Sequence, residues 1–185
     1  LLTMFSVARS QEDTTEGVIQ LASSGALKIG ELTVNSERPG QYEKFEITFD
    51  LTGEWDNPFD PEQIKVDAHF RAPDGKQMVI PGFFYQDYRL VGRRREAVGN
   101  PVWKVRFTPA AVGEYQYQVI ANNKGREIKS EMQNFTCQSF KTHHGFIRIS
   151  DDNPLYFEYS DGTPFVGIAL GRSQGDDGGS YQRFS

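Results

Sequence analysis

The chain has 185 residues and a formal net charge of −5 at pH 7, from 20 Lys and Arg against 25 Asp and Glu. Hydrophobic residues make up 37% and aromatic residues 13%, which is enough for a packed core and argues against a disordered chain. The negative charge argues against nucleic acid as a partner, because phosphate binding requires a basic surface. No apolar run approaches the ~18–20 residues that cross a bilayer, and a single cysteine, Cys137, rules out an internal disulfide.

Residues 1–24 are predicted to form an N-terminal segment and linker. The first eight residues are mostly apolar, and Ser6 and Ala8 have the spacing of the −3 and −1 positions of a signal-peptidase site. Two interpretations stay open here: the remnant of a signal peptide, or an ordinary segment that packs on the body of the protein. The first favours export, so we expect a secreted, periplasmic or cell-surface location.

Residues 25–140 are dominated by an alternation of apolar and polar side chains, as in a strand with one buried face. The clearest case is the segment 42–51, whose apolar positions are Phe45, Ile47, Phe49 and Leu51. The same period recurs at residues 64–70, 103–107 and 115–119, and further strands are predicted at 27–34, 78–80 and, with a break, 127–140. Turn dipeptides such as Asp74-Gly75 separate these segments. We predict an all-β fold, an immunoglobulin-like antiparallel β-sandwich.

One local motif favours this type of sandwich. Gly113-Glu114-Tyr115-Gln116-Tyr117 opens a strand shortly after Pro109, as in the tyrosine corner of such domains. In that interpretation a tyrosine hydroxyl forms a hydrogen bond with upstream backbone. The alternative is that Tyr115 and Tyr117 are two ordinary core residues of an alternating strand.

Residues 141–185 differ in character from the sandwich region. Two short strands, 146–149 and 156–159, flank a turn at Asp151-Asp152-Asn153-Pro154 and predict a hairpin. The apolar run 165–170 follows, which is typical of a strand buried on both faces, and the chain ends in a polar, glycine-rich stretch. We therefore expect a short β segment from the truncated start of a second domain.

The segment 42–119 resembles the immunoglobulin-like domain of unknown function that precedes the catalytic barrel of bacterial glycoside hydrolases. The residues that match are Asn57-Pro58-Phe59, Pro73-Asp74-Gly75, Pro81-Gly82-Phe83-Phe84, Trp103–Pro109 and Gly113–Tyr117. The stretch from His144-Gly145-Phe146 to Phe165 is similar to the opening of the barrel in apiosidase-like glycosidases. A charged loop with Arg93-Arg94-Arg95 departs from the pattern, as does the lack of a Trp and an Asp after Phe165. Because of these departures, the resemblance does not identify the subfamily or the substrate.

No catalytic residue is predicted in the chain. A glycosidase requires two carboxyl groups that face one pocket, ~5–5.5 Å or ~6.5–9.5 Å apart, and the resemblance implies that these lie beyond Ser185. We expect residues 1–185 to be inactive on glycans and to need no cofactor. No metal site is predicted either, because the adjacent His143 and His144 would point to opposite faces of a strand. Cys137 is predicted to be a small buried hydrophobe.

A group of aromatic residues lies at or near predicted turns instead of within alternating strands. Flat aromatic rings can stack on the apolar faces of sugars, so this group is a candidate carbohydrate-binding site. The alternative is that the rings cover the end of the sandwich or pack on a following barrel. The resemblance favours this alternative, because Asn57-Pro58-Phe59 and Gly82-Phe83-Phe84 belong to the family pattern. The candidate residues are Trp55, Phe59, Phe84, Tyr85 and Tyr88.

The sequence thus predicts a non-catalytic module of a secreted bacterial glycoside hydrolase. Its expected partners are a polysaccharide or oligosaccharide, met through the parent enzyme, and a downstream barrel that it contacts within the same chain. Neither nucleic acid nor a membrane span is expected. The alternative is a cell-surface adhesion or protein-interaction module, which would expose a contiguous apolar patch on a sheet face.

Overall fold

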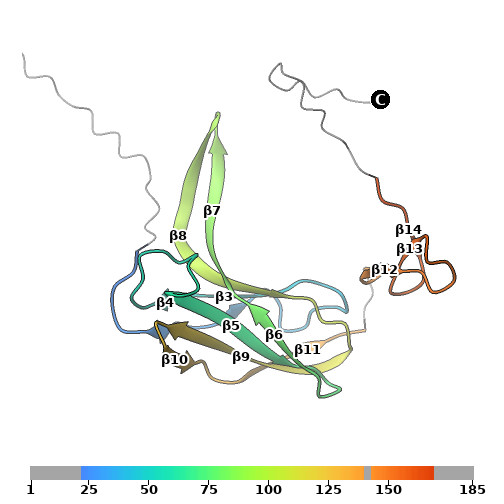
Figure 1. Cartoon of the computed structure of the whole chain (residues 1–185), viewed down its shortest axis with the longest axis horizontal. Coiled ribbons are helices and arrows are strands. Elements are labelled where there is room, and N and C mark those ends of the chain that lie inside the picture. The colour runs from blue at the N-terminus through green and yellow to red at the C-terminus, as the bar shows by residue number, and fades with distance from the viewer. Residues whose placement is uncertain (1–21, 140–142, 169–185) are drawn as a thin grey trace, which may run out of the picture. The chain divides into compact units, whose positions relative to one another are not determined.

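The computed structural model describes residues 22–139 and 143–168, and the regular structure within these ranges is strand throughout. The chain divides into two compact units between Thr142 and His143, and Figure 1 shows the strands of each. The predicted cleavage positions Ser6 and Ala8 lie outside the described residues. Within the described ranges there is no helix with the length and hydrophobicity of a membrane span.

The first unit contains two main antiparallel sheets, which confirms the predicted all-β sandwich. The central strands of the five-stranded sheet are β5 (Ile64–Arg71) and β9 (Gly113–Asn123). Strand β6 (Gln77–Pro81) pairs with β5, and both β10 (Arg126–Lys129) and β11 (Gln133–Cys137) pair with β9. The four-stranded sheet has the order β2 (Thr33–Val34), β3 (Phe45–Phe49), β8 (Arg94–Phe107) and β7 (Phe83–Val91).

The segment 27–34 differs from the single strand that its sequence predicts. It forms two short strands, and each pairs with a different partner: β1 (Lys28–Ile29) with β4 (Leu51–Thr52), and β2 with β3. Between them the Gly30 amide donates to the Asp50 carbonyl at 2.8 Å. A Cβ at position 30 would lie 3.1 Å from that carbonyl oxygen. The glycine therefore allows the close approach at which the segment changes partners.

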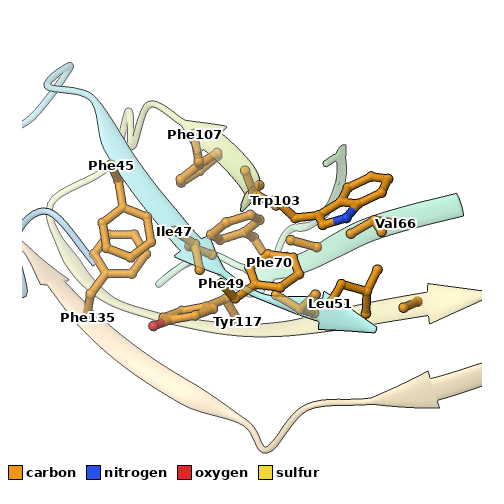
Figure 2. Close-up of a cluster of buried hydrophobic side chains, with 14 of the residues drawn as sticks. Phe45, Ile47, Phe49, Leu51, Val66, Phe70, Trp103, Phe107, Tyr117 and Phe135 are labelled. Carbon is orange, nitrogen blue, oxygen red and sulfur yellow. The ribbon is translucent and has the colours of Figure 1, made fainter. Parts of the chain in front are cut away.

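The alternation of each strand directs one set of side chains into a shared core. In the pairing of β3 with β8, Phe45 lies opposite Phe107 and Ile47 opposite Val105, and these side chains are buried. In the pairing of β5 with β9, Phe70 lies opposite Tyr117, and both are buried. Figure 2 shows side chains from the two sheets meeting in this layer. Such burial is the main stabilising contribution in a sandwich of this kind.

Aromatic rings fill one end of that core. Phe135 of β11 is stacked with Phe45, with 3.9 Å between centroids (Figure 2). It is also stacked with Tyr115, with 4.9 Å between centroids. Phe70 and Phe107 form a second stacked pair at 4.3 Å. Offset and edge-to-face ring contacts of this kind stabilise a core beyond the area that they bury. Phe135 thus bridges rings from both sheets.

The polar atoms of the core tyrosines have partners. The Tyr115 hydroxyl accepts a hydrogen bond from the Ala111 amide at 3.0 Å, which confirms the predicted bond to upstream backbone. The Tyr117 hydroxyl donates to Gln133 Oε1 at 2.6 Å, and burial raises the pKa of Tyr117 to about 12. Cys137 is fully buried, and burial raises the pKa of its thiol. The expectation that Cys137 is a small buried hydrophobe is confirmed.

The predicted charged loop around Arg93-Arg94-Arg95 is a pair of strands, so that prediction was wrong. Strands β7 and β8 continue past the sandwich as a long hairpin (Figure 1), in which all residues from 87 to 100 are exposed. Gly92, with φ of 63°, begins the two-residue turn between Val91 and Arg94. The alternating pattern is absent here because neither face of the hairpin is buried, so periodicity could not reveal it.

The second unit contains the predicted hairpin, formed by β12 (Ile147–Ile149) and β13 (Phe157–Tyr159), with β14 (Pro164–Phe165) added at its edge. Arg148 links the first two strands by an ion pair with Glu158 at 2.6 Å. The prediction of a buried strand over 165–170 was wrong for the described residues, because β14 ends at Phe165, and Val166 and Ile168 are 81% and 89% exposed. The rest of that run, residues 169–170, lies outside the described residues.

The core assignment predicts a large difference between two phenylalanines. Phe135→Ala removes a buried ring that contacts both sheets, and should lower the free energy of unfolding by about 3–5 kcal/mol. Phe59→Ala removes a ring that is 65% exposed, and should change it by less than about 1 kcal/mol. Urea denaturation of both variants measures the difference. Equal losses would contradict the placement of Phe135.

The hairpin beyond the sandwich should be dispensable for folding. Replacement of residues 90–95 by Asn-Gly keeps the Arg89–Glu96 pair next to a two-residue turn. Because no residue from 87 to 100 is buried, the midpoint of thermal unfolding should shift by less than about 2 °C. A cooperative loss of structure in this variant would show that the hairpin packs on the sandwich.

Candidate functional site

The five predicted aromatic residues do not form one surface. Phe84, Tyr85 and Tyr88 lie within strand β7, not at turns as predicted, and the strand alternation separates them. Phe84 packs against the hydrophobic core, whereas Phe83 and Tyr85 lie on the opposite face of the sheet. The predicted residues and their neighbours therefore lie in three locations: a row of rings that leads into the core, the outer sheet face, and the hairpin.

The first location is a row of edge-to-face rings that runs from the surface into the core. Phe59 contacts Phe84 with 5.6 Å between centroids, and Phe84 contacts Trp103 at 5.9 Å. Trp103 in turn contacts Trp55 at 6.2 Å. Trp55 is only 3% exposed, so its indole supports the row from inside and has no face open to a ligand.

Phe59 remains exposed because its loop is held by polar contacts. Its amide donates to Asn57 Oδ1 at 3.0 Å, the turn that Asx side chains favour. Gln63 ties the loop together, since its Oε1 accepts from the Asp56 amide at 2.8 Å and its Nε2 donates to Asp60 Oδ2 at 3.0 Å. These hydrogen bonds therefore fix the backbone of the loop that carries the exposed Phe59 ring.

The second location is the outer face of the four-stranded sheet, where aromatic and charged side chains gather. We call Glu46, Phe83, Tyr85, Lys104 and Arg106 the outer-face cluster. Lys104 Nζ lies 4.4 Å from the centroid of the Tyr85 ring, and the Arg106 guanidinium carbon lies 5.0 Å from that of Phe83. These are cation–π distances. Both rings are half-buried, so each keeps some surface open to solvent.

Glu46 holds the cations of the outer-face cluster in place. Its Oε1 accepts from Lys104 at 2.8 Å, and its Oε2 accepts from Arg106 at 2.6 Å and from Lys44 at 3.4 Å. Burial by itself raises the pKa of the Glu46 carboxyl, but the hydrogen bonds from Lys104 and Arg106 outweigh it and lower the pKa to about 2. Glu46 is therefore ionised at neutral pH, with both oxygens engaged.

Sequence reasoning missed the polar members of this cluster. Glu46, Lys104 and Arg106 occupy the polar positions of two alternating strands, which predicts that they face outward but not that they meet. The meeting depends on the register in which Glu46 lies opposite Arg106 and Phe83 opposite Lys104. A search for polar positions shared by neighbouring strands could have found them only once that register was known.

The third location is the hairpin, where Tyr88 is 44% exposed and lies opposite Ala97. A register shift separates it from Tyr85. At this bulge the Gln86 side-chain amide donates to the carbonyls of Asp87 and Val98, at 3.0 and 2.9 Å. Tyr88 is thus not part of the outer-face cluster.

Catalytic geometry is not evident in the parts of the chain that the structure describes. Those parts contain no group of three or more His, Cys, Asp or Glu that could hold a metal ion. An open groove of about 500 Å³ lies between residues 27–32 on one side and residues 128–131 with Gln133 on the other. None of the predicted aromatic residues lines it, so the groove and the aromatic surfaces are separate features.

The fold and these surfaces define an antiparallel β-sandwich domain with an aromatic and cationic face. Residues 38–122 match a protein family described as a domain of unknown function (DUF5060). No match to a curated protein was found. Among solved structures, the purple acid phosphatase PPD1 from yellow lupin (Lupinus luteus) seeds is 9% identical, with a TM-score of 0.39. That match covers 69% of this chain and 21% of the phosphatase chain.

Glu46 should contribute stability that depends on pH in a definite direction. Because its pKa falls from an ordinary value of 4.5 to about 2 on folding, its contribution is complete above about pH 4.5 and is lost as the pH falls towards 2. Glu46→Gln should lower the free energy of unfolding by about 1–3 kcal/mol at pH 7, with a smaller effect near pH 2.5.

Urea denaturation at both pH values measures this, with Glu127→Gln as the matched control. Glu127 has an exposed pair with Lys129 at 3.3 Å, which is worth little. An effect of Glu46→Gln that does not change between pH 7 and pH 2.5 would contradict the assigned pairing.

Proposed function

We propose that residues 25–140 form an immunoglobulin-like, non-catalytic module of a secreted bacterial glycoside hydrolase, which supports the catalytic barrel and binds carbohydrate. The main support is the presence of two half-buried rings, Phe83 and Tyr85, on an outer sheet face. Flat aromatic surfaces with adjacent hydrogen-bonding groups suit sugar rings, which have apolar faces and polar edges. The match of residues 38–122 to DUF5060 agrees with the resemblance but adds no activity.

In this proposal the second unit is the beginning of the catalytic barrel. Its described residues form a small three-stranded sheet. Several large apolar side chains on it are strongly exposed, including Leu155 at 85% and Tyr156 at 66%. Apolar exposure of this extent is unusual for a finished domain and is typical of a surface that other polypeptide covers. A barrel built onto this sheet would bury these side chains.

The second candidate function is an adhesion or protein-interaction module. The observation that favours it is the projecting hairpin, whose exposed apolar side chains include Leu90 at 72% and Val98 at 42%. A protein partner would bind to this hairpin, whereas a glycan would bind to the outer-face cluster. Shortening the hairpin therefore separates the two candidates, because it should leave glycan binding unchanged.

Affinity electrophoresis in native gels that contain single polysaccharides tests the binding function. The unmodified chain should be retarded by at least one of them. The variant Phe83→Ala/Tyr85→Ala should migrate as in a gel without polysaccharide, because the loss of two stacking rings removes most of the contact surface.

Phe84→Ala provides a matched control, since this ring packs against the core instead of facing outward. This variant should have a lower thermal midpoint, but the protein that is folded should still be retarded by the polysaccharide as the unmodified chain is. If no polysaccharide retards the unmodified chain, or if the double variant is retarded equally, carbohydrate binding at this face is wrong.

A further inference from the structure

We propose that the outer-face cluster binds a carbohydrate that carries negative charge, that is, carboxylate or sulfate groups on its sugar rings. This inference rests on the proposed function, because it names the ligand class for the same surface. Three observations support it: the local charge balance, the unused hydrogen-bonding capacity of Arg106, and the placement of the cations beside the rings.

The charge of this sheet face is opposite to that of the chain. The whole chain has a net charge of −5. Around Glu46, by contrast, Lys44, Lys104 and Arg106 set three positive charges against one carboxylate. The outer-face cluster, taken together with Lys44, is therefore locally positive.

Glu46 does not use the full binding capacity of its partners. Arg106 donates to it through Nε alone, and its two Nη groups make no hydrogen bond to another residue that the structure describes. The guanidinium carries five donors in a planar fork that matches a carboxylate or sulfate group. Because the Arg106 side chain is 47% exposed while that of Glu46 is 10% exposed, the free donors remain accessible.

The aromatic rings and the cations are arranged so that one ligand can contact both. The Arg106 guanidinium carbon lies 5.0 Å from the Phe83 centroid and 5.8 Å from the Tyr85 centroid. The two rings are 6.4 Å apart and nearly perpendicular. A sugar that packs on the open part of either ring therefore brings its ring substituents within reach of the Arg106 donors. Neutral sugars could stack there too, but only a negatively charged substituent would form charge-assisted hydrogen bonds with the free guanidinium donors of Arg106.

The test compares polymers that share a backbone and differ in charge. Binding of the full chain is measured by affinity electrophoresis at low salt with carboxymethylcellulose and hydroxyethylcellulose, and with dextran sulfate and dextran. We expect at least about tenfold tighter binding to the charged member of at least one pair, with a loss of that preference at high salt. A preference within the cellulose pair identifies carboxylate as the group that is bound, and a preference within the dextran pair identifies sulfate.

Variants locate the effect on the cluster. Arg106→Gln should reduce binding to the charged polymer about tenfold and, because it removes one partner of Glu46, should also lower the thermal midpoint by a few degrees while the protein stays folded. Arg106→Lys should restore part of the charge-dependent binding. Arg126→Gln is the matched control, because Arg126 is an exposed arginine on β10 of the five-stranded sheet. It should bind as the unmodified chain does.

The outcomes separate this inference from the proposed function. Equal binding to the charged and neutral members of both pairs would overturn the inference and leave carbohydrate binding intact. No binding to any polymer would overturn both. Charged binding that Arg126→Gln weakens as much as Arg106→Gln does would show non-specific attraction to arginines, and would also overturn the inference.

Discussion

The structure of the first unit depends on the closure of two sheets over one layer of aromatic rings. Phe135 lies in that layer, where it stacks with both Phe45 and Tyr115. Rings of this size can meet only if each strand directs every second residue inward, so the alternation cannot lapse within the sandwich. The polar positions between them are thereby placed on the outer faces.

The candidate site is a consequence of that constraint. Because Ile47, Val105 and their neighbours must point inward, the residues between them point outward in register, which brings Glu46 opposite Arg106. The buried carboxylate then fixes two cations beside the rings of β7. A cluster that is held by a sheet in this way is more rigid than one on a loop, and rigid placement reduces the entropy that the side chains of the site lose on binding. The site therefore owes its geometry to the core beneath it.

The constraint ends where β7 and β8 leave the sandwich. At the bulge after Tyr85 the register shifts, and beyond it the two strands have no sheet to cover them. Most strand boundaries within the sandwich follow from the alternation of apolar residues, as in β3 and β5. The hairpin could not be predicted in that way, because a strand with two exposed faces does not need alternating apolar and polar residues. Phe83 and Tyr85 lie on one face of β7 and Phe84 lies on the other. The sequence did not show this, because no alternating pattern indicated that the three residues belong to a strand.

Long-range pairing is the other feature that sequence alone did not reveal. Residues 27–34 have the composition of one strand, but Gly30 allows them to pair with β4 and then with β3. The cluster around Glu46 joins residues 58 and 60 positions apart in the chain. Such contacts depend on which strands become neighbours, and local composition does not determine that.

Quenching of tryptophan fluorescence by acrylamide tests the closure of the sandwich most directly. The chain has two tryptophans, Trp55 and Trp103, and both lie in the core at 3% and 4% exposure. If the sheets close as described, the native emission is blue-shifted, and acrylamide quenches it only weakly until the chain is unfolded by urea. Emission and quenching in the native state that equal those of the unfolded chain would contradict the closed core.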